Sequence, residues 1–237
     1  MATIGEDNFE LGLNRKRVNN KVEEVKTIDY TRKKQPIVNV SRKGYANVEL
    51  DSPFGVTIDH QTGNIYIADY REKSVMVFDS TAKYLFRFGD SNGKGEMNHP
   101  SGLAICGNRI LISLYNHCIL NYTLDGLFIS KIGKYGNGEL EFSYPFSLTM
   151  NESNEDIYIC DYYSNIVQIL TKDFHFKSQS GRDILKYPLD VKVFKKYIYI
   201  IDESNPCLHI FEQNLILLKS VILEGKECKL FILASFL

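Results

Sequence analysis

Short apolar segments separated by turn-forming residues repeat four times along this chain. Each repeat opens with a proline, and the leading prolines Pro53, Pro100, Pro145 and Pro188 are spaced 47, 45 and 43 residues apart. The apolar segments hold five to seven residues each and are rich in β-branched and aromatic types, which predicts β-strands. One four-stranded propeller blade with its turns occupies roughly 40–50 residues. The pattern therefore predicts an all-β fold, a β-propeller of four-stranded blades.

The first repeat shows the pattern in full. Its predicted strands are 53–59, 63–69, 74–78 and 84–89, separated by Gly, Asn, Asp or Ser. Several strands of the four repeats are apolar on both faces, which is typical of sheets stacked between neighbouring sheets. No repeat shows a helical period bounded by helix caps, so helical solenoids of similar period are not expected. The absence of tryptophan argues against the commonest propeller repeat.

The repeats resemble those of the NHL family. The pair Asn116 and His117 resembles the one that names the family, and residues 131–140 resemble its closing strand and glycine loop. Residues 86–95 match the same feature one repeat earlier. The resemblance covers about residues 36–222 and implies a propeller of six blades.

Three parts follow from this pattern. Residues 1–35 are polar and predict a flexible linker, residues 36–222 predict the propeller, and residues 223–237 form an atypical tail where a fifth proline-led strand is due. Residues 36–50 resemble one more repeat ending, an orphan outer strand with its loop. Four complete repeats are fewer than six blades, so we interpret the chain as a truncated or misassembled product, with a native shorter propeller as the alternative. An incomplete ring exposes apolar blade edges, which predicts self-association through them.

Composition adds a cellular context. The five cysteines form no C-x-x-C pair, the formal net charge is −1, and no apolar run approaches the length of a membrane span. No apolar signal segment opens the sequence. We therefore expect a soluble, cytoplasmic protein with reduced thiols, without membrane association and without a cofactor.

Small polar residues recur where the second strand of each repeat ends. They are Asp69, Ser113, Asp161 and Asp202. A ring of ligating carboxylates would be one interpretation, but serine at one of the four positions favours a structural role, in which each side chain accepts backbone N–H groups in its turn. Asp59 and Asp190, at or near inner strands, are better candidates for the central channel, although two carboxylates without a partner base make no mechanism.

Catalysis needs convergent groups that the sequence does not show. Some six-bladed propellers similar to this one are lyases or lactonases with a metal ion in the central channel, where several His or carboxylate ligands must converge. The histidines are scattered over unrelated positions, at His60, His99, His117, His175 and His209. We expect no catalytic residue and no metal site, and a metal-dependent lyase or lactonase stays as a second alternative.

Aromatic and polar residues follow the second strand in three repeats, where they would gather on one rim of the propeller. They are Tyr70, Arg71, Tyr115, Asn116, Tyr162, Tyr163 and Asn165. Exposed aromatic residues beside Arg and Asn are typical of recognition surfaces for protein or single-stranded RNA. Packing between neighbouring loops is the alternative interpretation.

We therefore expect a non-catalytic module that binds a protein partner through this rim. RNA binding is the first alternative, with Arg42, Lys43, Arg71 and Arg109 as phosphate contacts, although the net charge gives no general support for it. The NHL resemblance implies kinship with the propellers of tripartite-motif ubiquitin ligases, which carry zinc-binding RING and B-box domains. This sequence has no zinc-ligand spacing, so ligase activity could belong only to a longer parent protein.

Overall fold

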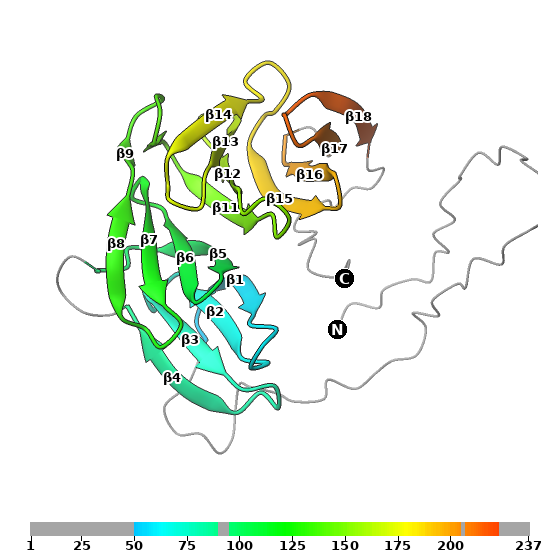
Figure 1. The fold of residues 1–237 in the computed structure, drawn as a ribbon. Coiled ribbons are helices and arrows are strands. Elements are labelled where there is room, and N and C mark those ends of the chain that lie inside the picture. The colour runs from blue at the N-terminus through cyan, green and yellow to red at the C-terminus, as the bar shows by residue number, and fades with distance from the viewer. Residues whose placement is uncertain (1–49, 90–94, 205–206, 223–237) are drawn as a thin grey trace, which may run out of the picture. The chain divides into compact units, whose positions relative to one another are not determined.

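The computed structural model describes residues 50–89, 95–204 and 207–222, which form four antiparallel sheets of four strands each (Figure 1). The expected flexible linker, the orphan strand of residues 36–49 and the atypical tail lie outside the described residues. Within each sheet the strands follow one another in chain order, as in a propeller blade. No helix long and apolar enough to cross a membrane occurs in the described part of the chain.

The strands have the following bounds. Blade 1 consists of β1 (Pro53–Ile58), β2 (Ile65–Asp69), β3 (Ser74–Phe78) and β4 (Tyr84–Phe88). Blade 2 consists of β5 (Pro100–Cys106), β6 (Arg109–Leu114), β7 (Cys118–Thr123) and β8 (Phe128–Ile132). Blade 3 consists of β11 (Pro145–Met150), β12 (Ile157–Asp161), β13 (Ile166–Leu170) and β14 (Phe176–Ser180). Blade 4 consists of β15 (Pro188–Phe194), β16 (Tyr197–Asp202), β17 (Cys207–Glu212) and β18 (Leu217–Ile222).

Strand ends differ from the sequence prediction by one or two residues. In blade 1, β1 ends at Ile58 instead of residue 59, and β2 begins at Ile65 instead of residue 63. The outer strand of blade 3 begins only at Phe176, because Phe174 adopts a positive φ of 65° and its backbone N–H closes the preceding turn by donating to the Thr171 carbonyl. The glycine loop between blades 2 and 3 contains a short parallel pair, β9 (Lys134–Tyr135) with β10 (Glu141–Phe142). The predicted arrangement of blades is otherwise confirmed.

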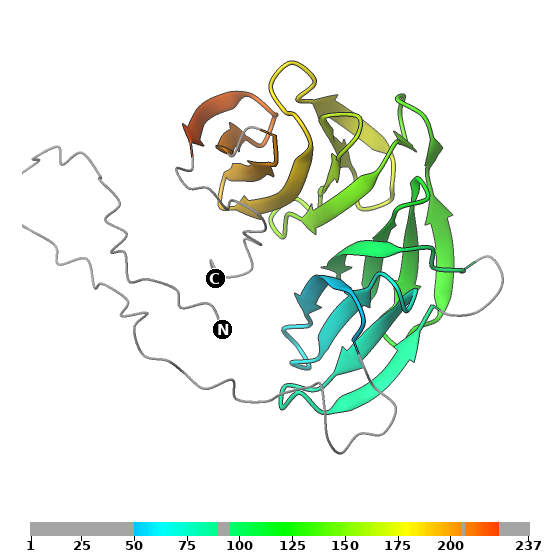
Figure 2. The same ribbon diagram turned by 180° about the vertical axis from the view of Figure 1, so that it is seen from behind.

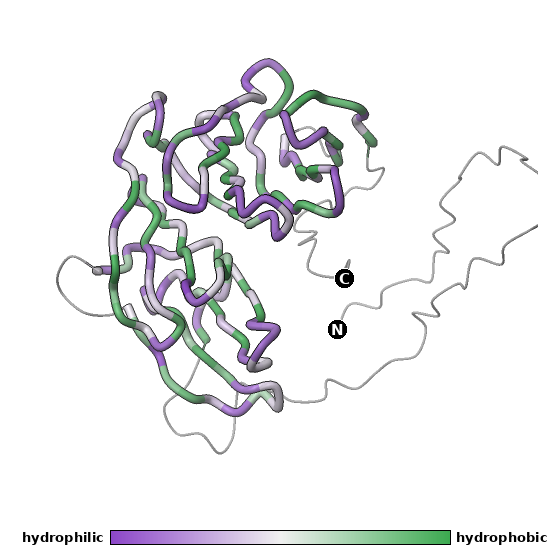
Figure 3. Tube along the Cα trace, in the orientation of Figure 1, coloured by the Kyte–Doolittle hydropathy of each residue, from purple (hydrophilic) through white to green (hydrophobic). Residues whose placement is uncertain are grey.

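The hydrophobic core lies between consecutive blades. Figure 3 shows the apolar stretches along the strands in green. In β6, Ile110 and Ile112 belong to the cluster shared with blade 1, whereas Leu111 between them belongs to the cluster shared with blade 3. Successive residues of a strand point to opposite faces, so a strand that packs on both sides must be apolar throughout. A third cluster joins blades 3 and 4. This sandwiching explains why the sequence shows weak alternation.

Tyrosine hydroxyls add polar links between blades. The Tyr66 hydroxyl donates to the Leu124 carbonyl of blade 2 at 3.1 Å, and the Tyr158 hydroxyl donates to the Gln213 carbonyl of blade 4 at 3.4 Å. Both side chains are buried, where a hydroxyl needs a partner. These positions are therefore used for packing and not for ligand contact.

The inner strands β1, β5, β11 and β15 pack side by side in that order, as both views of the fold show (Figure 2). Their first residues approach closely. A Cβ at Gly55 would lie 2.2 Å from the Ser101 carbonyl oxygen, and one at Gly102 would lie 2.6 Å from the Phe146 carbonyl oxygen. Only glycine fits at these two positions, so the small residue two places after the leading proline sets the spacing of the first three blades.

The strand registers place two sets of loops on opposite edges of the blades. Pro53 pairs with Asp69, which in turn pairs with Ser74, so the loop after the second strand lies where the inner strand begins. We call this edge the proline rim; it carries residues 70–73, 95–99, 115–117, 133–144, 162–165 and 181–187. The opposite edge, the far rim, carries turns at residues 59–64, 79–83, 107–108, 123–127, 151–156, 171–175, 195–196 and 212–216.

Apolar side chains are exposed on the first and last blades. Those on β1 are Phe54, Val56 and Ile58, and those beside or on β18 are Ile216, Leu218 and Ile222. Self-association through unclosed blade edges stays a prediction.

Candidate functional site

Buried carboxylates hold the loops of the proline rim in place through hydrogen bonds. Asp161 ends β12 and accepts hydrogen bonds from the backbone N–H groups of Ser143 and Tyr144, at 2.8 and 2.6 Å, and from the Ser164 hydroxyl at 2.7 Å. In blade 1, Asp69 accepts from the N–H groups of Asp51 and Ser52 in the same way. Each carboxylate therefore ties the loop after the second strand to the segment that enters the inner strand.

The other two side chains of this set, Asp202 and Ser113, make different contacts. The Asp202 carboxylate accepts from the backbone N–H of Lys186 in blade 4. Ser113 accepts from the Gly102 N–H at 2.8 Å and donates to the Phe146 carbonyl at 2.9 Å, so it links blade 2 to blade 3. The predicted contact, with backbone N–H groups of the turn after the second strand, occurs at Asp69, which accepts from Arg71 and Glu72. The other backbone contacts described above reach the adjacent loop or inner strand instead.

One backbone hydrogen bond recurs in all four blades. The first residue after the second strand donates to the carbonyl of the residue before the leading proline: Tyr70 to Ser52, Tyr115 to His99, Tyr162 to Tyr144 and Glu203 to Tyr187, at 2.8–3.1 Å. Because aromatic residues occupy most of these positions, the bond brings rings from two loops together.

The result is a continuous chain of nine rings along the proline rim. We call it the aromatic rim; it consists of Phe54, Tyr70, His99, Tyr115, Phe146, Tyr144, Tyr162, Tyr163 and Tyr187. The ring centroids of Tyr70 and His99 are 4.4 Å apart, those of Tyr115 and Tyr144 are 4.7 Å apart, and those of Tyr162 and Tyr187 are 5.0 Å apart. Contacts at 5.0–6.5 Å connect the remaining rings. Such spacings are favourable for aromatic pairs.

The aromatic rim has a buried base and an exposed outer layer. Tyr144 is 7% exposed, whereas Phe54, Tyr115 and Tyr163 are 40%, 41% and 51% exposed. Some rings therefore pack between loops, whereas others face solvent, and a recognition role for the exposed rings stays a prediction.

The aromatic rim carries little charge of its own. Burial raises the pKa of the Tyr144 and Tyr162 hydroxyls, and Tyr162 also donates to the Glu203 carboxylate, so both phenols are neutral at physiological pH. Burial, together with the Lys73 charge, lowers the pKa of His99 and favours its neutral ring. The exposed layer can therefore offer apolar ring faces and hydroxyl groups to a ligand.

All seven residues of the predicted binding rim lie on the proline rim, but their surroundings differ. Asn165 adopts a φ of 59° and accepts from the Tyr187 N–H at 2.9 Å, and Asn116 accepts from the Cys118 thiol at 3.3 Å. Arg71 forms an ion pair with Asp51 at 3.6 Å. The polar members thus shape the loops, and the tyrosines provide the exposed surface.

Sequence reasoning missed five members of the aromatic rim, namely Phe54, His99, Tyr144, Phe146 and Tyr187. Each is the residue directly before or after a leading proline. That position was a usable signal, because the residue before an inner strand lies on the same edge as the loop after the second strand.

The predicted RNA contacts do not form one surface. Arg71 lies on the proline rim, whereas Arg109 lies at the far rim, where it donates to the Lys172 carbonyl at 3.3 Å and sits 5.3 Å from the Phe174 ring centre. Arg42 and Lys43 lie outside the described residues.

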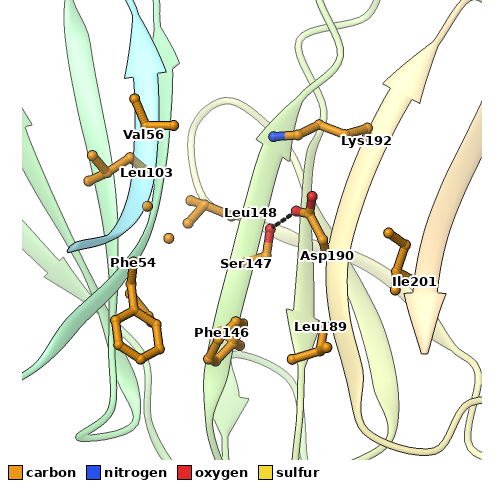
Figure 4. A pocket seen from close by; sticks show the side chains of 13 residues that line it. Phe54, Val56, Leu103, Phe146, Ser147, Leu148, Leu189, Asp190, Lys192 and Ile201 are labelled. Atoms are coloured by element: carbon orange, nitrogen blue, oxygen red, sulfur yellow. Dashed lines mark hydrogen bonds between the residues drawn. The ribbon is translucent and has the colours of Figure 1, made fainter. Parts of the chain in front are cut away.

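Beneath the aromatic rim the inner strands enclose a hollow of about 80 Å³ (Figure 4). Its apolar wall consists of Phe54, Val56, Leu103, Phe146, Leu148, Leu189 and Ile201. Its charged side chains are Asp190 and Lys192, both on β15. The Ser147 hydroxyl donates to Asp190 Oδ1 at 2.5 Å, as the dashed line in Figure 4 marks. Phe54 and Phe146 belong to both the hollow and the aromatic rim.

Asp59 is not a channel residue, which corrects the expectation from the sequence. It follows β1 at the far rim, where its carboxylate accepts from the Gln61 N–H at 3.0 Å and from the Thr62 hydroxyl at 2.6 Å. The Thr62 hydrogen bond lowers the pKa of Asp59 below its ordinary value. Asp59 and Asp190 therefore lie at opposite ends of the inner strands. Within residues 50–89, 95–204 and 207–222, no three His, Cys, Asp or Glu side chains gather as metal ligands would.

Comparison with known proteins supports the assignment of the four sheets as propeller blades. Residues 94–187 match a domain family described as a 6-bladed β-propeller. The fold is a β-propeller. No curated protein sequence matches the chain. The family match is to six-bladed propellers in general and does not single out the NHL family.

Solved propellers resemble the whole set of blades. The structure of a streptogramin B lyase has a TM-score of 0.58 at 11% identity, over 73% of this chain and 55% of that one. A nidogen–laminin complex gives 0.59 at 16% identity, over 73% and 64%, and hydrazine synthase from Kuenenia stuttgartiensis gives 0.58 at 13% identity, over 76% and 51%. This chain thus spans 51–64% of the chains it resembles. At such identities the likeness concerns the fold alone.

Proposed function

We propose that this propeller is a non-catalytic binding module that recognises a segment of a partner protein through the aromatic rim. The observation that carries the proposal is the continuity of nine rings across four blades, with Phe54, Tyr115 and Tyr163 each at least 40% exposed. Tyrosine is enriched in protein interfaces because it offers a large rigid surface and a hydroxyl at low entropic cost.

The rim is organised before any partner arrives. Asp161 fixes the backbone of Tyr144 and Ser143, and Asn165 fixes that of Tyr187. A surface held in place by its own hydrogen bonds loses little conformational entropy on binding, so more of the contact energy appears as affinity. This arrangement suits recognition of a partner by shape.

Protein is favoured over RNA by the charges around the rings. Arg71 is paired with Asp51, and the carboxylates of Glu72 and Glu203 lie on or beside the same rim. Arg109 faces the opposite edge. An RNA ligand would need unpaired cations along its phosphates, and its affinity would fall steeply with salt. We expect partner binding to change little between low and moderate salt.

Binding is also favoured over lyase or lactonase chemistry. The streptogramin B lyase shares the fold with this chain. The described residues offer the Ser147–Asp190 pair in the hollow but no histidine beside it. In a tripartite-motif parent, the same rim would select the substrate of the ligase.

Site-specific photo-crosslinking tests the proposal. A benzoylphenylalanine at position 163, in the exposed layer, should yield discrete adducts with one partner protein in cells that express the chain. The matched control is position 84, where Tyr84 begins β4 at the far rim. The same adducts from both positions, or adducts with nucleic acid at position 163, would contradict the proposal.

A further inference from the structure

One carboxylate oxygen that lines the hollow is buried and has no hydrogen-bond partner among the described residues. Asp190 Oδ1 accepts from the Ser147 hydroxyl at 2.5 Å and from the Val191 N–H at 2.9 Å. Asp190 Oδ2 is buried and accepts no hydrogen bond from any described residue. Leaving such an oxygen unsatisfied costs free energy, and the cost is larger when the group is charged. A donor that enters the hollow would remove this cost.

A lysine of opposite charge shares the hollow. Lys192 follows Asp190 by two residues on β15, so both side chains lie on the same face of the strand. In Figure 4 the Lys192 side chain extends from β15 toward the β11 side, as the Asp190 side chain also does. Among the described residues, the Lys192 ammonium pairs with no carboxylate. The hollow thus presents one acceptor and one cation at separate points.

Only the last two repeats carry polar side chains at the position two residues after the leading proline. The residues two positions after the leading prolines are Gly55, Gly102, Ser147 and Asp190. In the first two blades the position is filled by the backbone of the next inner strand, as the close Cβ distances show. Between blades 3 and 4 it carries a hydroxyl and a carboxylate instead, and the apolar side chains of Phe146, Leu148 and Leu189 surround them.

We infer that the hollow binds a free α-amino acid with an apolar side chain. The ammonium group of the ligand donates to Asp190 Oδ2, its carboxylate pairs with Lys192, and its side chain packs against Phe54, Val56 and Leu148. A zwitterion is the ligand class that satisfies both charged groups at once, whereas an amine or an acid alone leaves one of them unpaired. The inference does not depend on the aromatic rim as a protein-binding surface.

Three related probes test the two charged contacts separately. L-leucine carries both groups, 3-methylbutylamine lacks the carboxylate, and 4-methylpentanoate lacks the ammonium. Isothermal titration calorimetry of leucine into the full chain should show saturable binding. The two truncated probes should bind at least about tenfold more weakly, because each loses one charged contact. Equal affinity for leucine and either truncated probe would overturn the inference.

Two substitutions assign the contacts. Asp190→Asn keeps an acceptor for Ser147 and Val191 but removes the charge. The affinity for leucine should therefore fall about tenfold, while the affinity for 4-methylpentanoate should not change. Lys192→Met should lower the affinity for leucine to a similar extent, while the affinity for 3-methylbutylamine should not change. The control variants are Glu212→Gln and Lys219→Met, which make the same charge changes at exposed positions of blade 4.

The remaining outcomes decide the matter. The inference would be supported if the two control variants bind leucine with wild-type affinity and the circular dichroism spectra of all four variants match that of the wild type. No heat of binding from leucine up to about 10 mM, or loss of affinity in the control variants as well, would overturn it. Protein crosslinking at position 163 can succeed or fail in either case.

Discussion

The rings of Tyr115 and Tyr144 meet edge to face at a centroid separation of 4.7 Å, with an interplanar angle of 70°. Tyr115 belongs to the loop after β6 in blade 2, and Tyr144 is the residue before the leading proline of blade 3. The pair therefore connects two blades at the proline rim. Since Tyr144 is buried and Tyr115 is 41% exposed, it also connects the base of the aromatic rim to its outer layer.

The base and the outer layer should respond differently to truncation. Tyr144→Ala removes a buried ring and should lower the free energy of unfolding by about 3 kcal/mol. Tyr163→Ala removes an exposed ring and should change it by less than about 1 kcal/mol. Urea denaturation followed by circular dichroism measures both. Equal losses in the two variants would show that the rings do not divide into a buried base and an exposed layer.

The fold could be predicted because every blade repeats the same physical requirement. Pro53, Pro100, Pro145 and Pro188 begin inner strands that have no hydrogen-bonded neighbour on one side, where proline is tolerated. The central strands must be apolar on both faces because they pack against two blades. The short pair β9 and β10 could not be predicted. Each strand has only two residues, and the loop is held by hydrogen bonds between the backbone of Leu140 and Glu141 and the Gln168 side chain of blade 3.

Gly102 should be intolerant of any side chain. Alanine there would bring its Cβ within 2.6 Å of the Phe146 carbonyl oxygen and 2.9 Å of the Ser113 hydroxyl, both fixed by the contact between blades 2 and 3. We expect Gly102→Ala to lower the free energy of unfolding by at least about 3 kcal/mol.

The matched control for this prediction is Gly107, which has a φ of 62° and no atom within 4 Å of the point where a Cβ would lie. Gly107→Ala should cost only the strain of a left-handed alanine, about 1 kcal/mol. Thermal denaturation of both variants measures the difference. A larger loss for Gly107→Ala would mean that the inner strands are not in close contact.

Asp161 should matter more for stability than an ordinary turn aspartate. Its side chain is fully buried and accepts three hydrogen bonds, from Ser143, Tyr144 and Ser164. Asp161→Ala would leave these donors without an acceptor, with an expected loss of about 3 kcal/mol or more. Asp161→Asn retains one acceptor oxygen and should lose less. Hydrogen exchange at the amides of Ser143 and Tyr144 should accelerate in the alanine variant and would stay unchanged if the carboxylate had no structural role.

His209 should make stability depend on pH. Burial lowers its pKa below the ordinary value of 6.5, and the nearby Asp202 carboxylate opposes this only in part. The unfolded chain therefore takes up the proton first as pH falls below about 6.5, so stability declines through that range and levels off below the pKa of the folded state. His209→Gln should reduce the decline between about pH 8 and pH 5, as measured by urea denaturation at both values. An unchanged decline would contradict the assignment.

The candidate site was predictable only in part. The loop after the second strand pointed to Tyr70, Tyr115, Tyr162 and Tyr163, because aromatic residues recur there in successive repeats. The rings before the prolines also recur, as His99, Tyr144 and Tyr187, but only the geometry shows that this position faces the loop after the second strand. The unpartnered oxygen of Asp190 was beyond sequence reasoning altogether, since it depends on how blades 3 and 4 approach each other.

The most direct test of the binding module is the affinity of the purified crosslinked partner for three versions of the chain. The wild type and Tyr84→Ala should bind equally well. The double variant Tyr115→Ala, Tyr163→Ala should bind at least about 30-fold more weakly, since two exposed anchors are lost without loss of the fold. Undiminished affinity in the double variant would contradict recognition through the aromatic rim.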